Sequence, residues 1–185
     1  VPFSAYRKDD DLRAAIHVLM WDLNDPLGAI RQQRILAVMF HGLGRWQQAR
    51  HETELAIEVA DQNNAERESG GLRLNLAVTQ IKSGDLASVE SLLDRSEKDL
   101  SNACEHKSLL LLSLVRANYL RITGHTAKAL EILIPALQTT RDQQYSREEA
   151  ITLEYIGDCH LAQKEFKKAF EHYEQAMKIA EATAP

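Results

Sequence analysis

Residues 44–49 read GRWQQA, and similar stretches return along the chain at a constant distance. They read GDLASV at 84–89, GHTAKA at 124–129 and KEFKKA at 164–169. Each step is therefore 40 residues. A fixed period between about 20 and 50 residues is typical of proteins built from stacked repeats. The recurring stretch predicts units that cannot bury their apolar faces alone and pack against their neighbours.

The composition agrees with a helical, folded chain. The 185 residues fit one domain, and 44% of them are hydrophobic while 26% are charged. Only eight residues are Gly and four are Pro, which favours helices over a sheet rich in turns. The net charge of −5 argues against direct binding of nucleic acid or of an anionic membrane surface.

Three features bear on cellular context. The longest apolar run, residues 109–115 with Ser113 interrupting it, is far too short to span a membrane. The two cysteines, Cys104 and Cys159, have no CxxC partner, so we expect a reducing, cytoplasmic location and no disulfide framework. The chain begins with Val1 and has no initiator Met, so we expect a piece of a longer protein.

Helical periodicity and helix-end signals divide the chain into nine expected helices and no strands. Asp25 and Pro26 are typical of the N-cap and first position of a helix. Capping boxes are predicted at Asn63 with Glu66, at Asn102 with Glu105 and at Ser146 with Glu149. The expected helices cover residues 9–23, 26–41, 46–60, 64–82, 86–100, 103–122, 126–140, 147–162 and 165–180. The fourth contains Gly70 and Gly71, each of which costs about 1 kcal/mol relative to Ala inside a helix.

Side-chain size recurs in step with the 40-residue period. Small residues stand at three positions of each repeat, where two crossing helices can approach closely. Counted from residues 30, 70, 110 and 150, the eighth position holds Ala37, Ala77, Ala117 and Gly157, the twentieth Ala49, Val89, Ala129 and Ala169, and the twenty-seventh Ala56, Ser96, Ala136 and Ala176. The bulky seventeenth position holds Trp46, Leu86, Thr126 and Phe166.

This pattern resembles that of tetratricopeptide repeats over about residues 26–182. The resemblance implies an all-α, right-handed superhelix, or α-solenoid, of antiparallel helix pairs. We expect one domain, residues 1–185, with a leading half-repeat at 1–25 and four helix pairs at 26–64, 65–102, 103–145 and 146–185. The chain departs from the family at the early Trp position, which holds Gln33, Arg73, Ser113 and Leu153, and at Lys164, which replaces the turn glycine. The 40-residue period resembles the long-helix repeats of bacterial transcriptional regulators and signalling adaptors.

The resemblance also implies a partner-binding groove on the concave side. There the first helix of each pair would present its second, fifth, ninth and twelfth positions. In this sequence these are Arg31, Arg34, Val38 and His41; Gly71, Leu74, Val78 and Ile81; Leu111, Leu114, Asn118 and Arg121; and Ile151, Glu154, Asp158 and Leu161. An apolar middle between charged ends suits an amphipathic helix or an extended peptide. The alternative is that the longer helices turn some of these residues, such as Leu111 and Ile151, into the core.

Two further surface features are predicted. Arg67, Lys107 and Arg147 recur at 40-residue steps and would form a basic ladder for an acidic partner or a phosphate, or else a solvated helix start. Phe166, Phe170 and Tyr173 crowd the last helix, with nothing after it to cover them. We therefore expect either a continuing chain or a homodimer through the C-terminal helix.

These observations predict a non-catalytic scaffold that binds a protein or peptide segment, or a flanking domain of its own chain. The long-repeat resemblance favours the regulatory or sensor part of a bacterial signalling or transcriptional regulator. The alternatives are a sensor for a small molecule or signal peptide, and a phosphatase or hydrolase using Glu154 and Asp158 as a carboxylate pair. No metal or cofactor is expected, since residues 51–54, HETE, lack the second His of a zinc helix and no phosphate-binding Gly-rich loop is present.

Overall fold

The structure is a computed structural model that describes residues 3–183, with side chains from Asp10 onward. This part of the chain contains nine α-helices and no strand, which confirms the all-α prediction. The helices are α1 (Phe3–His17), α2 (Pro26–Gly42), α3 (Trp46–Gln62), α4 (Glu66–Ser83), α5 (Val89–Asn102), α6 (His106–Ile122), α7 (Thr126–Asp142), α8 (Ser146–Ala162) and α9 (Phe166–Thr183). A short π-helical segment, η1 (Val18–Asp22), extends α1.

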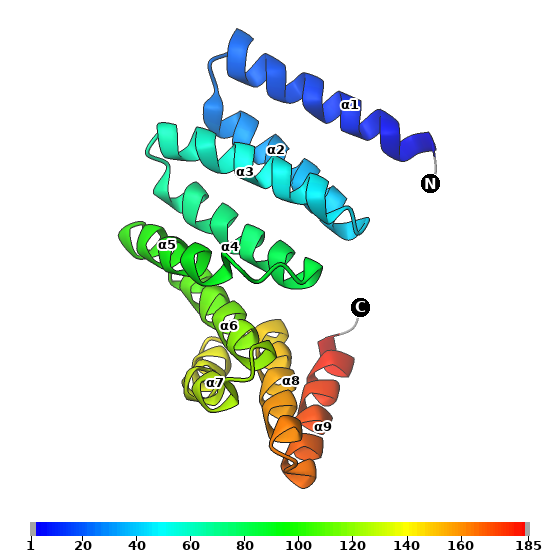
Figure 1. The fold of residues 1–185 in the computed structure, drawn as a ribbon, viewed down its shortest axis with the longest axis vertical. Coiled ribbons are helices and arrows are strands. Elements are labelled where there is room, and N and C mark those ends of the chain that lie inside the picture. The colour runs from blue at the N-terminus through cyan, green and yellow to red at the C-terminus, as the bar shows by residue number, and fades with distance from the viewer. Residues whose placement is uncertain (1–2, 184–185) are drawn as a thin grey trace. The chain divides into compact units, whose positions relative to one another are not determined.

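The contacts divide the chain into two compact units, residues 1–106 and 107–185. In the first unit, each of α1 to α4 packs against the next helix along the chain (Figure 1). Leu12 and Ile16 of α1 pack against a buried cluster of Leu36, Phe40 and Ala49. A second cluster joins α2, α3 and α4 through Ile30, Ala56, Ala60 and Leu72. The expected single domain stays a prediction.

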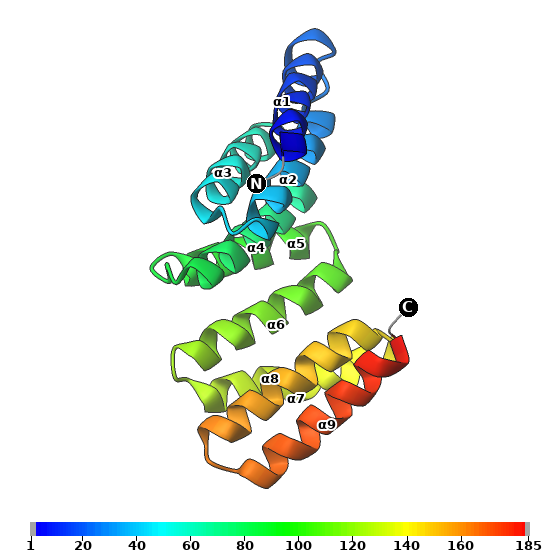
Figure 2. The same ribbon diagram turned by 90° about the vertical axis from the view of Figure 1, so that its right-hand side faces the viewer.

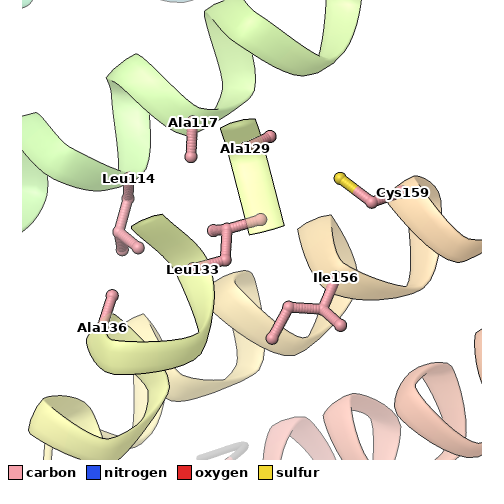
Figure 3. Packing of buried hydrophobic residues seen from close by; sticks show 7 residues of the cluster. All are labelled: Leu114, Ala117, Ala129, Leu133, Ala136, Ile156 and Cys159. Atoms are coloured by element: carbon pink, nitrogen blue, oxygen red, sulfur yellow. The ribbon is translucent and has the colours of Figure 1, made fainter. Parts of the chain in front are cut away.

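The second unit contains α6 to α9, with α8 and α9 lying side by side (Figure 2). Its core is made by three helices. Leu114 and Ala117 come from α6, Ala129, Leu133 and Ala136 from α7, and Ile156 and Cys159 from α8 (Figure 3). Because the side chains at 117 and 129 are small, α7 approaches α6 closely and Leu133 fills the neighbouring space.

The small residues that carried the repeat prediction lie at equivalent, buried places in the two units. Ala77 and Ala117 are fully buried, Ala37 is nearly so, and Gly157 is buried against α9. The twentieth positions are all buried, and of the twenty-seventh positions only Ala176 is half-buried. Size therefore recurs because successive helix pairs repeat the same packing.

The turns recur with a shorter period than the 40-residue step of the sequence. A residue with left-handed backbone angles follows each helix at steps of 20 residues, namely Asn24, Gly44, Asn64, Gly84, Cys104, Gly124, Gln144 and Lys164. From position 44 onward, the next residue donates its N–H to the carbonyl five positions back, as Arg45 does to Phe40 at 2.9 Å and Glu165 to His160 at 2.9 Å. This is the bond of a Schellman helix end. A helix plus its turn thus takes 20 residues in both halves of every repeat.

The three predicted capping boxes are wrong. Asn63 ends α3, and its side-chain amide donates to the Val59 carbonyl at 2.8 Å. Asn102 is the last residue of α5 and donates to Glu66 at 2.9 Å, while Ser146 is already helical. Competition from the Schellman turns explains the error, because those turns leave the following helices to start without a side-chain cap. The Asp25 cap is confirmed, with the Gly28 N–H at 2.8 Å from its carboxylate.

The start of α5 and the continuity of α4 could be established only from the structure. Helix α5 begins at Val89 rather than at Leu86, and Ser88 just before it donates its hydroxyl to Gln80 at 2.8 Å. Helix α4 runs unbroken through Gly70, where a Cβ would lie 2.7 Å from Leu100 Cγ. Close packing of α4 on α5 therefore explains a glycine that helix propensity disfavours.

Candidate functional site

In the first unit, α2 and α4 present the predicted binding residues on neighbouring helices. Arg31, Arg34 and Val38 of α2 are exposed, and 60% of the Val38 surface is accessible. His41 is half-buried at the end of the same row. On α4, Val78 and Ile81 are half-buried, as is Gly71. Leu74 is only 7% accessible, so this predicted groove residue is part of the core.

A groove of about 110 Å³ lies between α2, α3 and α4. Arg34, Val38 and His41 line it from α2, and Asn75 and Val78 line it from α4. The rings of His41 and Trp46 meet in a T-shaped arrangement with their centroids 4.9 Å apart. His41 Nε2 is buried and has no hydrogen-bond partner within the described part of the chain. The groove therefore has an apolar floor, with Arg34, His41 and Asn75 among its polar lining residues.

The sequence did not reveal a set of polar residues that connects three helices of the first unit. Arg73 of α4 is 3% accessible and binds Asp61 of α3, with Nη2 to Oδ1 at 2.7 Å, and Asp99 of α5. Burial alone would raise the pKa of Asp61, but hydrogen bonds from Ser69 and Arg73 lower it below its usual value. The only sequence signal was that Arg73 stands where the family has Trp. These ion pairs hold three helices together.

One repeat earlier, a buried carboxylate is similarly bound by polar side chains of other helices. Glu52 of α3 is 2% accessible and accepts a bond from Arg13 of α1 at 2.6 Å. Gln33, the equivalent of Arg73, donates to the same carboxylate at 3.4 Å. In the first two repeats, the residues that stand in place of the family's early Trp thus make polar contacts between helices.

In the second unit, four polar groups of the predicted and neighbouring positions form one network. Arg121 of α6 donates to Asn118 at 2.8 Å and pairs with Asp158 of α8 at 3.1 Å. Tyr173 of α9 donates its phenol to the other oxygen of Asp158 at 2.7 Å. Burial and this hydrogen bond raise the pKa of Tyr173 to about 12. Asp158 is therefore engaged on both oxygens and cannot act with Glu154 as a free carboxylate pair.

The remaining predicted residues of this unit fall into three groups by burial. Leu114 is 3% accessible and belongs to the core of Figure 3, so it is not a surface residue. Leu111 and Ile151 are half-buried, while Glu154 and Leu161 are exposed.

A larger groove, about 720 Å³, lies between α8 and α9. It brings together residues that the sequence assigned to separate features, namely Arg147 of the basic ladder and Ile151, Glu154 and Asp158 of the expected binding face. Helix α9 contributes residues that were not predicted as a site, Tyr173, Ala176, Met177, Ala180 and Thr183. Met177 is 56% accessible, and Phe166 and Phe170 on the same helix are exposed as well.

The basic ladder is not a row of free cations. Arg67 pairs with Glu105 at 2.9 Å, and Lys107 pairs with Glu148 at 3.7 Å. In each case the carboxylate comes from the start of the next helix pair. Arg147 is exposed and has no carboxylate partner among the described residues. Arg67 and Lys107 are thus engaged in exposed ion pairs, and the ladder as a site for an acidic partner or a phosphate stays a prediction.

Cysteines and other potential ligands do not gather in the described part of the chain. Cys104 is exposed in a turn, and Cys159 is buried, which raises the pKa of its thiol. Within residues 3–183, no group of three or more His, Cys, Asp or Glu side chains is placed to hold a metal ion. The same residues include no helix that is both long and apolar enough to cross a membrane.

This architecture is similar to that of known proteins. A family model described as tetratricopeptide repeat matches residues 108–182. A search of curated protein sequences finds no match. Among solved structures, BtubC (BKLC) from P. vanneervenii is similar over 95% of this chain and 76% of its own, with a TM-score of 0.74 and 18% identity.

Two structures of a putative kinesin light chain from Podosopora anserina, with nearly identical TPR-like repeats, are also similar. One of them, a form with a single substitution, covers 95% of this chain and 86% of its own, with a TM-score of 0.71 and 18% identity. The other form covers 98% and 94%, with a TM-score of 0.61 and 17% identity. At such identities these likenesses show the fold. The tetratricopeptide repeat model thus covers residues 108–182, and the described chain has the fold of a tetratricopeptide-like helical solenoid.

Proposed function

We propose that this chain is a non-catalytic protein-interaction module and that its α2/α4 groove binds an acidic peptide segment with an apolar anchor. The observation that carries the proposal is Val38, a large apolar side chain left 60% accessible beside two exposed arginines. Isolated exposed apolar residues are ordinary, but this one lines a groove together with Arg34 and His41. Tetratricopeptide repeats generally serve as protein-binding scaffolds, which supports the same conclusion.

The chemistry of the groove selects the ligand. Arg31 and Arg34 have no carboxylate partner among the described residues, so a ligand carboxylate would not have to displace an existing ion pair. Val38 and Val78 offer an apolar surface, and the exposed Asn75 side chain offers polar atoms at its edge. An extended segment with one apolar side chain flanked by Asp or Glu satisfies each of these groups.

The proposed biological setting is the regulatory part of a bacterial signalling or transcriptional regulator in the cytoplasm. In that setting the groove holds either a separate protein or a flanking domain of the same chain. The long 40-residue repeat supports this setting. We assign no catalysis to either unit, because Asp158, a member of the candidate carboxylate pair, is held by Arg121 and Tyr173.

Fluorescence anisotropy with synthetic peptides of about a dozen residues, long enough to cross the groove in extended form, tests the binding mode. The probes carry a central Leu flanked by Glu, and matched peptides replace Glu by Lys or Leu by Ser. We expect the Leu/Glu peptide alone to bind, and its affinity to fall with rising salt. Arg34→Glu should weaken binding about 3- to 10-fold, the size expected for reversing an exposed charge.

The matched control is Ile35→Asp, because Ile35 is also an exposed apolar residue of α2 but does not line the groove. Val38→Asp should abolish binding while Ile35→Asp leaves it unchanged. Equal binding of the Lys and Glu peptides, or equal effects of the two aspartate variants, would refute the proposal.

A further inference from the structure

The groove between α8 and α9 occupies the place where, one repeat earlier, a helix is already packed. Within the second unit, Ile156 and Cys159 of α8 share one buried cluster with Leu114 of α6 and with Leu133 and Ala136 of α7 (Figure 3). A shift of 40 residues turns those three supporting positions into Glu154, Tyr173 and Ala176. All three line the α8/α9 groove. This groove therefore has the position and the walls of an inter-repeat interface that carries no helix among the described residues.

The ion pairs between successive helix pairs indicate which charged group such a helix would carry. Arg67 is paired with Glu105, directly before α6, and Lys107 is paired with Glu148 in the first turn of α8. Each cation at the start of a pair's first helix thus receives a carboxylate from the start of the next pair. Arg147 is the third member of the series and has no such carboxylate within residues 3–183.

The rest of the groove is mostly apolar. Ile151 and Ala150 of α8 face Ala176, Met177 and Ala180 of α9 across the same groove. Met177 is 56% accessible although its equivalent, Leu137, packs against the core of the preceding repeat. Burial of this surface by a helix would supply the hydrophobic part of the binding free energy.

We propose that the α8/α9 groove binds an amphipathic helix of another protein, one that carries a carboxylate in its first turn for Arg147 and an apolar stripe for Ile151 and Met177. The helix runs in the direction of α8, since the start of α8 lies beside the start of α6 at Lys107 and a later turn beside Arg121. A carboxylate near a helix N-terminus is also favoured by the helix dipole.

A second copy of this chain fits the groove less well. The segment of the chain that has the required register is α8 itself, and its apolar face is consumed in its own unit, where Leu153 and Ile156 are at most 2% accessible. A second copy would instead offer the exposed phenylalanines of α9, which bring no carboxylate to Arg147. The α8/α9 site is separate from the α2/α4 groove and does not depend on it.

A peptide that copies residues 145–162 with Cys159→Ser is a direct probe, because α8 already fits the equivalent surface. Its binding to the full chain is measured by fluorescence anisotropy. We expect saturable binding that Arg147→Glu weakens about 5- to 10-fold, the effect of reversing one partner of an exposed ion pair. A second peptide with Glu148→Lys should bind the Arg147→Glu chain better than it binds the original chain.

Two controls keep the outcomes distinct. Lys128→Glu reverses an exposed charge on α7 outside the groove and should leave binding unchanged, and circular dichroism melting should show all variants folded. Absence of peptide binding, or failure of the charge exchange, overturns the proposal. So does a homodimer in light scattering that Met177→Asp dissociates, because the occupant would then be a second copy. None of these results bears on the acidic-peptide test at Val38.

Discussion

Gly157 of α8 lies so close to Tyr173 of α9 that a Cβ on the glycine would stand 2.6 Å from the ring carbon Cε1. The equivalent pairs in the other repeats are Ala37 with Thr53, Ala77 with Leu93, and Ala117 with Leu133. A larger partner in the last repeat is therefore matched by a smaller residue opposite. The tyrosine also reaches Asp158 through its hydroxyl, which the other partners cannot do.

This relationship predicts the effect of Gly157→Ala. In a helix, Ala is favoured over Gly by about 1 kcal/mol, but the clash with the Tyr173 ring should reverse the sign and destabilise the fold by about 1–3 kcal/mol. In the Tyr173→Leu background the same substitution restores the Ala/Leu pair of the preceding repeats and should be neutral or stabilising. Urea denaturation of the four proteins in this cycle measures the coupling. Equal effects in both backgrounds would show that the two side chains do not compete for space.

The turn before α9 offers a second prediction. Lys164 has a φ of 62°, in the place where Gly44, Gly84 and Gly124 satisfy the same left-handed geometry. Lys164→Gly removes the steric cost of a Cβ there, and we expect a net gain of about 0.5–1 kcal/mol in the free energy of unfolding. Lys164→Ala is the control, since it removes the same charge and keeps the Cβ. Thermal melting that finds the two variants equally stable would assign any gain to charge rather than to backbone strain.

The fold could be predicted largely because small residues and turn glycines repeat in sequence. The helix count and the burial of Ala77 and Ala117 follow from local patterns. The 20-residue period of the turns was harder to detect, because Asn64, Cys104 and Gln144 share a backbone conformation without sharing a side-chain type. Asparagines at these ends were accordingly mistaken for caps of the next helix.

The site was less predictable because it depends on contacts between helices distant in sequence. Position in the repeat could not tell that Leu114 turns into the core, nor that Asp158 is held by Arg121 and Tyr173. The same holds for the basic ladder, whose partners Glu105 and Glu148 lie 38 and 41 residues further along than their respective cations. Pairing across a repeat boundary needs the register of the helices as well as their sequence.

The buried ion pairs of Arg73 give a third prediction. Arg73→Met leaves Asp61 and Asp99 close together without their cation, and we expect a loss of about 3 kcal/mol in the free energy of unfolding. Replacing both aspartates by Asn in the same chain should recover a large part of that loss, because the unpaired charges are then absent. Guanidinium or urea titration compares the variants. A triple variant no more stable than Arg73→Met would indicate that packing of the arginine, rather than its charge, supports the three helices.

Asp61 makes the same cluster sensitive to acid, which is a fourth prediction. Its pKa in the folded chain is lowered below its ordinary value, so the folded state binds the proton less readily than the unfolded state. The stabilisation is present above the unfolded pKa and is lost as the pH falls through the folded one. We expect stability to decline below about pH 4, and Asp61→Asn should flatten this part of the profile. Asp142→Asn is the control, because it changes an exposed carboxylate at the end of α7. Asp25→Asn is not suitable, because Asp25 caps α2.

The paired histidines of the last repeat predict a separate transition near neutrality. His160 and His172 stack with their ring centroids 5.4 Å apart, and His172 Nδ1 is buried without a partner among the described residues. Burial, followed by the charges of His160 and Arg141, lowers the pKa of His172, while Glu171 opposes the shift and Glu165 binds His160. Because the folded pKa lies below the unfolded value of 6.5, stability is full above pH 6.5 and declines as the pH falls through the folded pKa.

Melting temperatures from just above neutrality down to about pH 5, across the range in which histidines titrate, provide the measurement. His172→Gln removes the titrating group and should flatten the profile in this window, whereas His51→Gln changes an exposed histidine of α3 and should preserve the slope. Each of the two variants removes one imidazole, so the two chains have the same number of histidines. A slope that survives in His172→Gln would place the proton-linked change in a different group, and the stacked pair would then be a packing contact with no influence on pH dependence.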